Sequence, residues 1–282
     1  IKFSNIDINM IVSHIADYVQ KINKTILGIS IGLPGVVDPV TGIIINSRYL
    51  QLANYPLKKK LQCEFKCPIL INNNANLAAF AEYYNVAQQK NIKNILFLYI
   101  QELFVNNVTH IGFGLGIIIN GQIYHGEHLQ AGEFNKAINF YKNKLIDNNE
   151  TAALLQKKDM DRLQQNSLPE LFQKSQNGDK AAALFIDKLF SILSELISMA
   201  ISIIDPGITF IGYDSNQKLD PLFLNHLREF LLKRSLNVTS KLPGIEASEL
   251  NGRSVMIGAA NKMLDTLFQV PELKNSLLYS NI

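Results

Sequence analysis

A group of side-chain amides follows a short apolar run in the first third of the chain. Pro68-Ile69-Leu70-Ile71 leads directly into Asn72-Asn73-Asn74-Ala75-Asn76. An asparagine amide donates and accepts hydrogen bonds, so Asn73 and Asn74 can together hold the hydroxyl groups of a ligand. The same amide cannot take a proton from a hydroxyl, so these residues predict binding without general-base chemistry.

Alternating strand and helix patterns surround this segment and must position it. Apolar residues at helical spacing predict a helix near residues 8–22, and Ile26–Ile31 reads as a buried strand that runs into a Pro34-Gly35 turn. Strand 68–71 and the helix after Asn74 complete a first α/β layer. We expect one lobe at residues 1–93 and a second at 94–282, with the last helix packing back on the first lobe.

The second unit has its own strands and helices. Apolar runs predict strands at 95–100 and 117–119, and Asn120-Gly121 predicts a hairpin turn. Helices dominate from residue 151 to 204, followed by a strand at 208–212, a helix at 221–233, a short strand near 245 and a helix at 254–268.

Composition limits the class of protein. The 282 residues are 47% hydrophobic and 18% charged, and the net charge is +3, which is ordinary for a globular chain with a sizeable core. Lys58-Lys59-Lys60 is a short basic run of the kind found on solvated helix faces. Cys63 and Cys67 lack the further ligands of a zinc site. The apolar stretch from Leu189 to Ile204 is interrupted by Glu195 and is short for a membrane span, so we expect a cytoplasmic protein without a membrane or metal partner.

Several landmarks occur in the order found in one known family. They are Ile29–Asp38 with its Pro-Gly turn, Asn46-Ser47, Ile71–Asn76, the glycines Gly112, Gly114 and Gly116 followed by Asn120-Gly121, then Ala131-Gly132-Glu133, Asp205-Pro206, Ile211-Gly212 and Gly258-Ala259-Ala260. In this order they resemble the ROK family of sugar kinases and sugar-responsive repressors. The resemblance implies an α/β, two-lobed, actin-like ATPase (ribonuclease-H-like) fold with sugar and ATP meeting between the lobes.

The resemblance also implies a set of residues around the sugar. They are Gly35, Ser47, Arg48, Asn73, Asn74, Glu133, Lys136 and Glu150. Lys136 stands where the family has a sugar-contacting histidine, and it can serve a negatively charged ligand or be a solvated surface lysine. Glu150 is the candidate for the family's distal glutamate.

The departures from the family concern phosphate transfer. Asn74 stands where the kinases have an aspartate base, a role worth roughly 10²–10⁴-fold in rate. Gly112, Gly114 and Gly116 match the phosphate-loop hairpin, but His110-Ile111-Gly112 replaces its Gly-Thr-Gly. Since a β-branched apolar residue would crowd an anion in that turn, we expect the loop to be vestigial. Gly212-Tyr213 replaces a glycine pair, so a ring is expected to fill the space for the nucleotide base.

Two further family features are missing from the sequence. The amino-terminal Asp-x-Gly-x-Thr motif is absent, so we expect an incomplete N-terminal lobe without its first hairpin. The family's cysteine-rich zinc loop is also absent, so we expect no metal and no cofactor.

The sequence therefore predicts a sugar-sensing effector domain of a ROK-type repressor, which binds a monosaccharide, an amino sugar or a sugar phosphate without phosphorylating it. We expect a homodimer that reaches DNA only through an N-terminal domain absent from this chain. One alternative is a sugar kinase in which Glu133 replaces the missing base. A second alternative is a dimerisation scaffold without a ligand.

Overall fold

The computed structural model describes residues 8–22, 24–105, 108–133, 163, 165–214, 220–234 and 244–268. The first element is helix α1 (Ile8–Lys21), whose inward face joins a small apolar core. Lys136 and Glu150 lie outside the described residues, as do residues 151–162 of the helical region predicted from 151 to 204.

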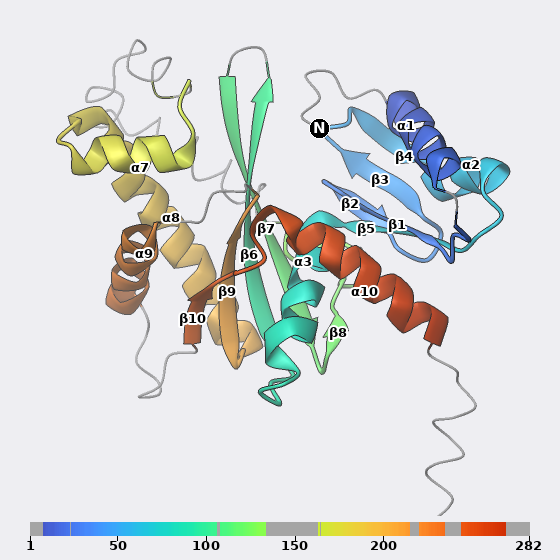
Figure 1. Cartoon of the computed structure of the whole chain (residues 1–282). Helices are drawn as coiled ribbons and strands as arrows, with labels where there is room; N and C mark the ends of the chain where they lie inside the picture. Colours follow the sequence, from blue (N-terminus) through green and yellow to red (C-terminus); the bar gives the residue numbers. More distant parts are fainter. Residues whose placement is uncertain are drawn as a thin grey trace, which may run out of the picture.

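Two small sheets follow α1. Strands β1 (Ile29–Leu33) and β5 (Ile69–Asn73) pair in parallel. Strands β2 (Val36–Asp38), β3 (Ile43–Ser47) and β4 (Leu52–Tyr55) form an antiparallel meander. Helix α2 (Leu57–Glu64) packs on this part through its buried leucines. Figure 1 shows these elements in blue and cyan on one side of the molecule.

A five-stranded sheet forms the other half, in the order β10-β9-β6-β7-β8. Strands β6 (Ile95–Val105) and β7 (Val108–Ile119) make a long antiparallel hairpin, and β8 (Gln122–Ile123) follows the predicted Asn120-Gly121 turn. Strands β9 (Ile208–Tyr213) and β10 (Gly244–Ala247) add to the other side of β6 in parallel.

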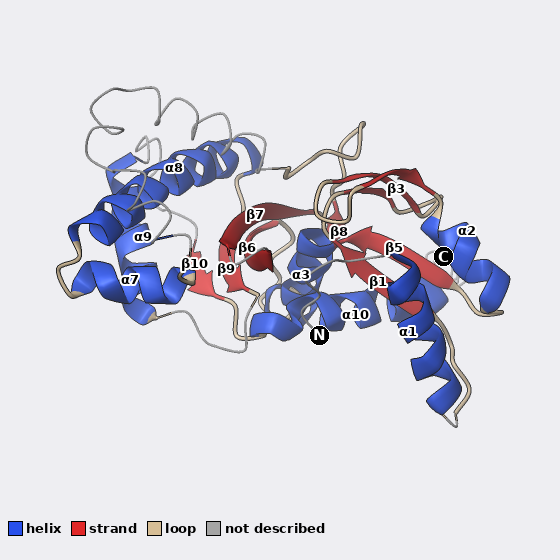
Figure 2. Cartoon of the chain, turned by 90° about the horizontal axis from the view of Figure 1, so that it is seen from above, coloured by secondary structure: helices blue, strands red, loops and turns tan. Residues whose placement is uncertain are grey.

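Helices cover the two faces of this sheet. On one face lie α7 (Leu168–Gln176), α8 (Lys180–Ile204) and α9 (Pro221–Arg234), around an apolar core that includes Phe190 and Phe223. On the other face lies α3 (Asn74–Glu82), continued by the π-helical turn Tyr83–Ala87, against Phe97 and Phe210. Figure 2 shows the first group of helices at one end and the small sheets at the other.

Helix α3 reaches β7 closely because of a glycine. A Cβ at Gly116 would collide with the carbonyl oxygen of Ala75 and the Cβ of Ala79, both on α3. The last helix, α10 (Ser254–Phe268), preceded by the 3₁₀ turn Asn251–Arg253, packs on α3 and β1 (Figure 1). Helix α3 thus lies between the last helix and the five-stranded sheet, and its first residues face the small sheets.

The open side of β1 borders an apolar groove. In the described part of the chain β1 pairs with β5 only, and α10 packs against the face of β1, where a Cβ at Gly32 would meet Val255. Ser30, Gly32, Val255 and Met263 are among the residues that line the groove. This groove is separate from the amide segment at Asn73.

The structure corrects the expectation for the glycine-rich hairpin. The sequence placed His110, Ile111 and Gly112 in a turn, but they continue β7 and pair with Leu103, Glu102 and Gln101 of β6. The strands extend because both polar residues after the apolar run, Gln101 and Glu102, find hydrogen-bond partners in the fold. The side-chain oxygen of Gln101 accepts a hydrogen bond from Asn74. The carboxylate of Glu102 accepts a hydrogen bond from the backbone N–H of Leu168, at the start of α7.

In the part of the chain that the structure describes, no helix combines the length and the apolar character needed to cross a bilayer. The same ranges contain no group of three or more histidine, cysteine, aspartate or glutamate side chains that could hold a metal. Cys63 and Cys67 are both free thiols.

Candidate functional site

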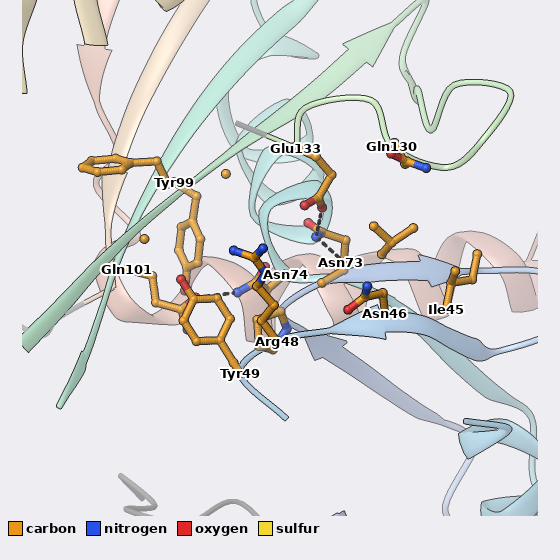
Figure 3. Close-up of a pocket in the computed structure, with 16 residues that line it drawn as sticks. Ile45, Asn46, Arg48, Tyr49, Asn73, Asn74, Tyr99, Gln101, Gln130 and Glu133 are labelled. Carbon is orange, nitrogen blue, oxygen red and sulfur yellow. Dashed lines mark hydrogen bonds between the residues drawn. The ribbon is translucent and has the colours of Figure 1, made fainter. Parts of the chain in front are cut away.

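A cavity of about 220 Å³ lies where the small sheets meet the β6–β7 hairpin. It is lined by residues from five segments: Pro34, Gly35 and Val36; Ile45, Asn46, Arg48 and Tyr49; Asn73 and Asn74; Tyr99, Gln101, Gly112, Phe113 and Gly114; and Gln130 and Glu133. The cavity lies just below the usual range of roughly 300–1,000 Å³ for ligand pockets, which suits a small ligand. Figure 3 shows the polar side chains converging on it.

Asn73 ties three segments together at the end of β5. Its side-chain oxygen accepts from Asn76 N–H (3.1 Å), which makes it the N-cap of α3. Its Nδ2 donates to the Gly35 carbonyl (2.9 Å) and, at 3.5 Å, to Oε1 of Glu133. Both donors of the amide are therefore used, and one lone pair of its oxygen stays available to a ligand.

Asn74, the first residue of α3, is 8% exposed. Its oxygen accepts from the backbone N–H of Ala75 (2.9 Å), and its Nδ2 donates to Oε1 of Gln101 (3.2 Å) across the cavity. One N–H and one lone pair remain. Asn74 can thus still donate to and accept from the same hydroxyl group.

Gly35 gives the turn between β1 and β2 its shape. Its φ of +117° is a conformation that favours glycine, and a Cβ there would collide with the carbonyl oxygen of Asn46. The turn consequently presents the Gly35 carbonyl to Asn73.

Ser47 is placed differently from the expectation. It is 1% exposed and is not among the lining residues of the cavity. Its hydroxyl donates to the Pro34 carbonyl (2.6 Å) and accepts from the Leu50 N–H (3.3 Å). Ser47 therefore fixes the turn after β3, and its neighbours Arg48 and Tyr49 are the ones that reach the cavity.

Glu133 lies in the segment that follows β8. Gly132 accepts a hydrogen bond from Leu115 N–H of β7 (2.9 Å), and Glu133 N–H donates to the Gln130 carbonyl (3.2 Å). These bonds hold the Glu133 carboxylate over Asn73 (Figure 3).

Burial and nearby charges shift the pKa values of two groups at or near the cavity, Tyr49 and His125. Burial, and then the negative charge of Glu133, raise the pKa of the Tyr49 hydroxyl, while Arg48 acts in the opposite direction. Close to α3, burial and then the charge of Lys262 lower the pKa of His125, whose Nδ1 lies 3.4 Å from Nδ2 of Asn76. The imidazole therefore favours its neutral form, as a hydrogen-bonding group beside the site.

The glycines of the proposed vestigial loop have unequal surroundings. Gly112 and Gly114 line the cavity, whereas Gly116 lies against α3. A Cβ at Gly112 would lie 2.5 Å from the hydroxyl oxygen of Tyr49, so Tyr49 reaches from the β3–β4 turn to the hairpin. This approach joins the β3–β4 turn to the hairpin beside the cavity.

Tyr213 packs inside the protein. It is 4% exposed and belongs to the core under α7 and α8. Burial, and then a hydrogen bond to Glu102, raise the pKa of its hydroxyl.

Sequence reasoning missed Tyr49, Tyr99, Gln101 and Gln130, all of which line the cavity. Gln101 directly follows the apolar run 95–100, so a polar residue at the end of a buried strand was the available signal. Tyr49 gave no signal of its own, because only the turn that Ser47 holds directs it across the cavity.

Comparison with known proteins gives both repressors and kinases. The xylose repressor of Caldicellulosiruptor bescii is 24% identical over 88% of this chain, and the chain spans 65% of that protein. A β-glucoside kinase of Listeria innocua is 25% identical over 86% of this chain and 81% of its own length. The chain thus spans just under two thirds of the repressor.

A solved structure shows the same fold. The ROK family glucokinase from Streptomyces griseus, in complex with glucose and AMPPNP, has a TM-score of 0.66, 20% identity, and coverage of 90% of this chain and 87% of that one. This confirms the predicted α/β, actin-like ATPase fold class. The profile of the ROK family matches residues 4–265, and the chain belongs to the ROK family.

Proposed function

We propose that the chain binds a monosaccharide in this cavity and acts as the effector-binding part of a ROK-type regulator without phosphorylating the sugar. The observation that carries the proposal is Asn74. It contributes an amide, already hydrogen-bonded to Gln101 and with one donor and one acceptor left, where a kinase needs a base.

The hairpin supports the same reading. Phosphate loops bind an anion with successive backbone N–H groups that converge. His110, Ile111 and Gly112 lie in an extended strand paired with β6, and successive N–H groups of a strand point in opposite directions. An anion would meet one such group here rather than several.

A regulator needs a ligand that favours one arrangement of the protein, since a ligand shifts an equilibrium only by its differential affinity. The lining residues come from segments on both sides of the cavity, and the contacts Asn73–Glu133 and Asn74–Gln101 already join them. A sugar that inserts between these groups would change those contacts first. The division into lobes at residues 1–93 and 94–282, the homodimer, the cytoplasmic location and the link to DNA through an N-terminal domain stay predictions.

The alternative is a sugar kinase, and the kinase relatives and Glu133 favour it. Glu133 is the carboxylate among the cavity's lining residues. It accepts a hydrogen bond from Asn73, so it lies near the expected place of a sugar hydroxyl.

Titration calorimetry and a turnover assay separate the two functions. Neutral monosaccharides should bind with the same affinity in the presence and absence of Mg-ATP, and no ADP should form. ADP release that depends on sugar, and that is abolished in Glu133→Gln, would establish the kinase. If no mono- or amino sugar binds, both functions fail and the scaffold remains.

A further inference from the structure

Arg48 is the cation among the residues that line the cavity. Within the described ranges its guanidinium has no hydrogen bond or ion pair, unlike Asn73, Asn74 and Glu133. It is exposed at the rim, and its side chain points into the cavity (Figure 3). The positive charge is thus available to a ligand.

Two charged side chains from different segments line the cavity, and both act on the pKa of Tyr49. Glu133 belongs to the loop after β8 and lies with Asn73, whereas Arg48 belongs to the turn after β3 and is next to Tyr49. A ligand with hydroxyls only would leave the positive charge of Arg48 without a partner. A ligand with hydroxyls at one end and an anion at the other would use both.

We propose that Arg48 binds an anionic substituent, a carboxylate or a phosphate, on a monosaccharide whose hydroxyls lie against Asn73, Asn74 and Glu133. This inference rests on the proposed function and specifies its class of ligand. Arg48 is then the residue that selects acidic sugars over neutral ones.

The chemistry of the guanidinium suits this role. Its planar fork donates two parallel hydrogen bonds to a carboxylate or a phosphate, which a lysine cannot reproduce. Hydrogen bonds to charged groups contribute roughly 1.5–3 kcal/mol, which corresponds to about a tenfold to a hundredfold gain in affinity. Since Arg48 is exposed, part of this gain should be screened by salt.

The hydrogen bonds of Ser47 fix the turn that carries Arg48. The buried Ser47 hydroxyl holds the Pro34 carbonyl and the Leu50 N–H, so the backbone of the turn around Arg48 is fixed. Tyr49 extends from the same turn to Gly112. The guanidinium therefore starts from an ordered segment beside the cavity.

The test uses three series of ligands, and the members of one series differ only at the carbon that carries the anion or is unmodified. Calorimetry would measure the affinity for glucose, glucuronate and glucose 6-phosphate, and for the same three forms of galactose and of mannose, with the unaltered chain, Arg48→Gln and Arg48→Lys. Lys59→Gln is the matched control, because it removes one positive charge from an exposed position on α2 that does not line the cavity.

For the ring that fits, an acidic form should bind about tenfold to a hundredfold more tightly than its neutral form, and added salt should reduce this ratio. The ratio should fall close to one in Arg48→Gln, be partly restored in Arg48→Lys and stay unchanged in Lys59→Gln. Preference for only the uronate or only the phosphate identifies which anion the site takes.

Two other outcomes have distinct meanings. Neutral sugars that bind as tightly as their acidic forms, or a preference that survives Arg48→Gln, would overturn the inference and leave the proposed function intact. Failure of every member of all three series to bind would remove the proposed function, and the inference with it.

Discussion

Asn74 is held at both ends of its side-chain amide, by Ala75 N–H and by Gln101 Oε1. Asn74→Asp would remove the N–H that donates to Gln101 and place a carboxylate at a site that is 8% exposed. We expect a loss of about 1–3 kcal/mol in the free energy of unfolding, and no ATP turnover. Urea denaturation and a coupled assay for ADP measure the two effects.

The control is Asn54→Asp, at an exposed asparagine on β4. It should change stability much less. Sugar-dependent ADP release by Asn74→Asp would contradict the view that the strand-like hairpin is also incompatible with phosphate transfer.

Glu82 carries a pH dependence of its own. This residue of α3 is 1% exposed and accepts a hydrogen bond from the Ser248 hydroxyl. Burial raises its pKa from 4.5 to about 7, with Glu249 and Glu246 adding to the shift and the Ser248 bond opposing it. The folded state therefore binds the proton more tightly than the unfolded state.

The sign follows from that difference. The contribution of Glu82 to stability is complete below about pH 4.5 and is lost as the pH rises through about 7. The shift corresponds to at most about 3 kcal/mol. Urea denaturation at pH 5 and pH 8 should show this loss in the unaltered chain and little of it in Glu82→Gln, with the exposed Glu64→Gln as control. An equal loss in Glu82→Gln would assign the dependence to other groups.

Helix α3 depends on how closely it can approach β7. A Cβ at Gly116 would collide with backbone and side-chain atoms of α3, whereas a Cβ at Gly244 on β10 would make ordinary contacts of 3.6 Å or more. Gly116→Ala should therefore lower the free energy of unfolding by about 1–3 kcal/mol. Gly244→Ala should have little effect, because the added Cβ makes only ordinary contacts. It is a matched control, since both glycines lie in strands and both substitutions add the same methyl group.

Denaturant titration of the two variants measures the difference. Binding should also weaken in Gly116→Ala, since a shift of α3 moves Asn73 and Asn74 at its start. Equal stability of the two variants would mean that α3 can move away from the sheet without cost.

Helices were more predictable from the sequence than strands. Helix α10 has the predicted bounds, Ser254–Phe268, because its apolar spacing is regular and a loop precedes it. Strands β6 and β7 were predicted too short, because Gln101 and Glu102 interrupt the apolar pattern. The local sequence pattern cannot show that the Glu102 carboxylate accepts a hydrogen bond from the start of the distant helix α7.

The residues of the site were also predictable only in part. Asn73, Asn74 and Glu133 come from segments that resemble the family, and the structure brings them together. Gln101 and Tyr49 reach the cavity through strand register and through one turn. These are consequences of tertiary structure, and single-sequence reasoning had no access to them.

Ligand binding should be visible in the stability of the whole chain. A sugar that binds only the folded state, at 100 times its Kd, should raise the free energy of unfolding by about 2.7 kcal/mol. Mg-ATP at millimolar concentration should add nothing. Thermal denaturation with each compound measures this, and stabilisation by Mg-ATP alone would show a nucleotide site and favour the kinase.

Among the described residues no strand pairs with the second edge of β1, and this has a consequence for amide hydrogen exchange. Ile29 N–H donates to the Pro68 carbonyl on the β5 side (2.9 Å), so by strand alternation the Ile31 N–H faces β5 as well. The N–H groups of Ser30 and Gly32 then point away from β5. Deuterium should replace the amide hydrogens of Ser30 and Gly32 quickly and those of Ile29 and Ile31 slowly. A strand that pairs with this edge would be recognised because it slows exchange at Ser30 and Gly32 and leaves exchange at Ile29 and Ile31 unchanged.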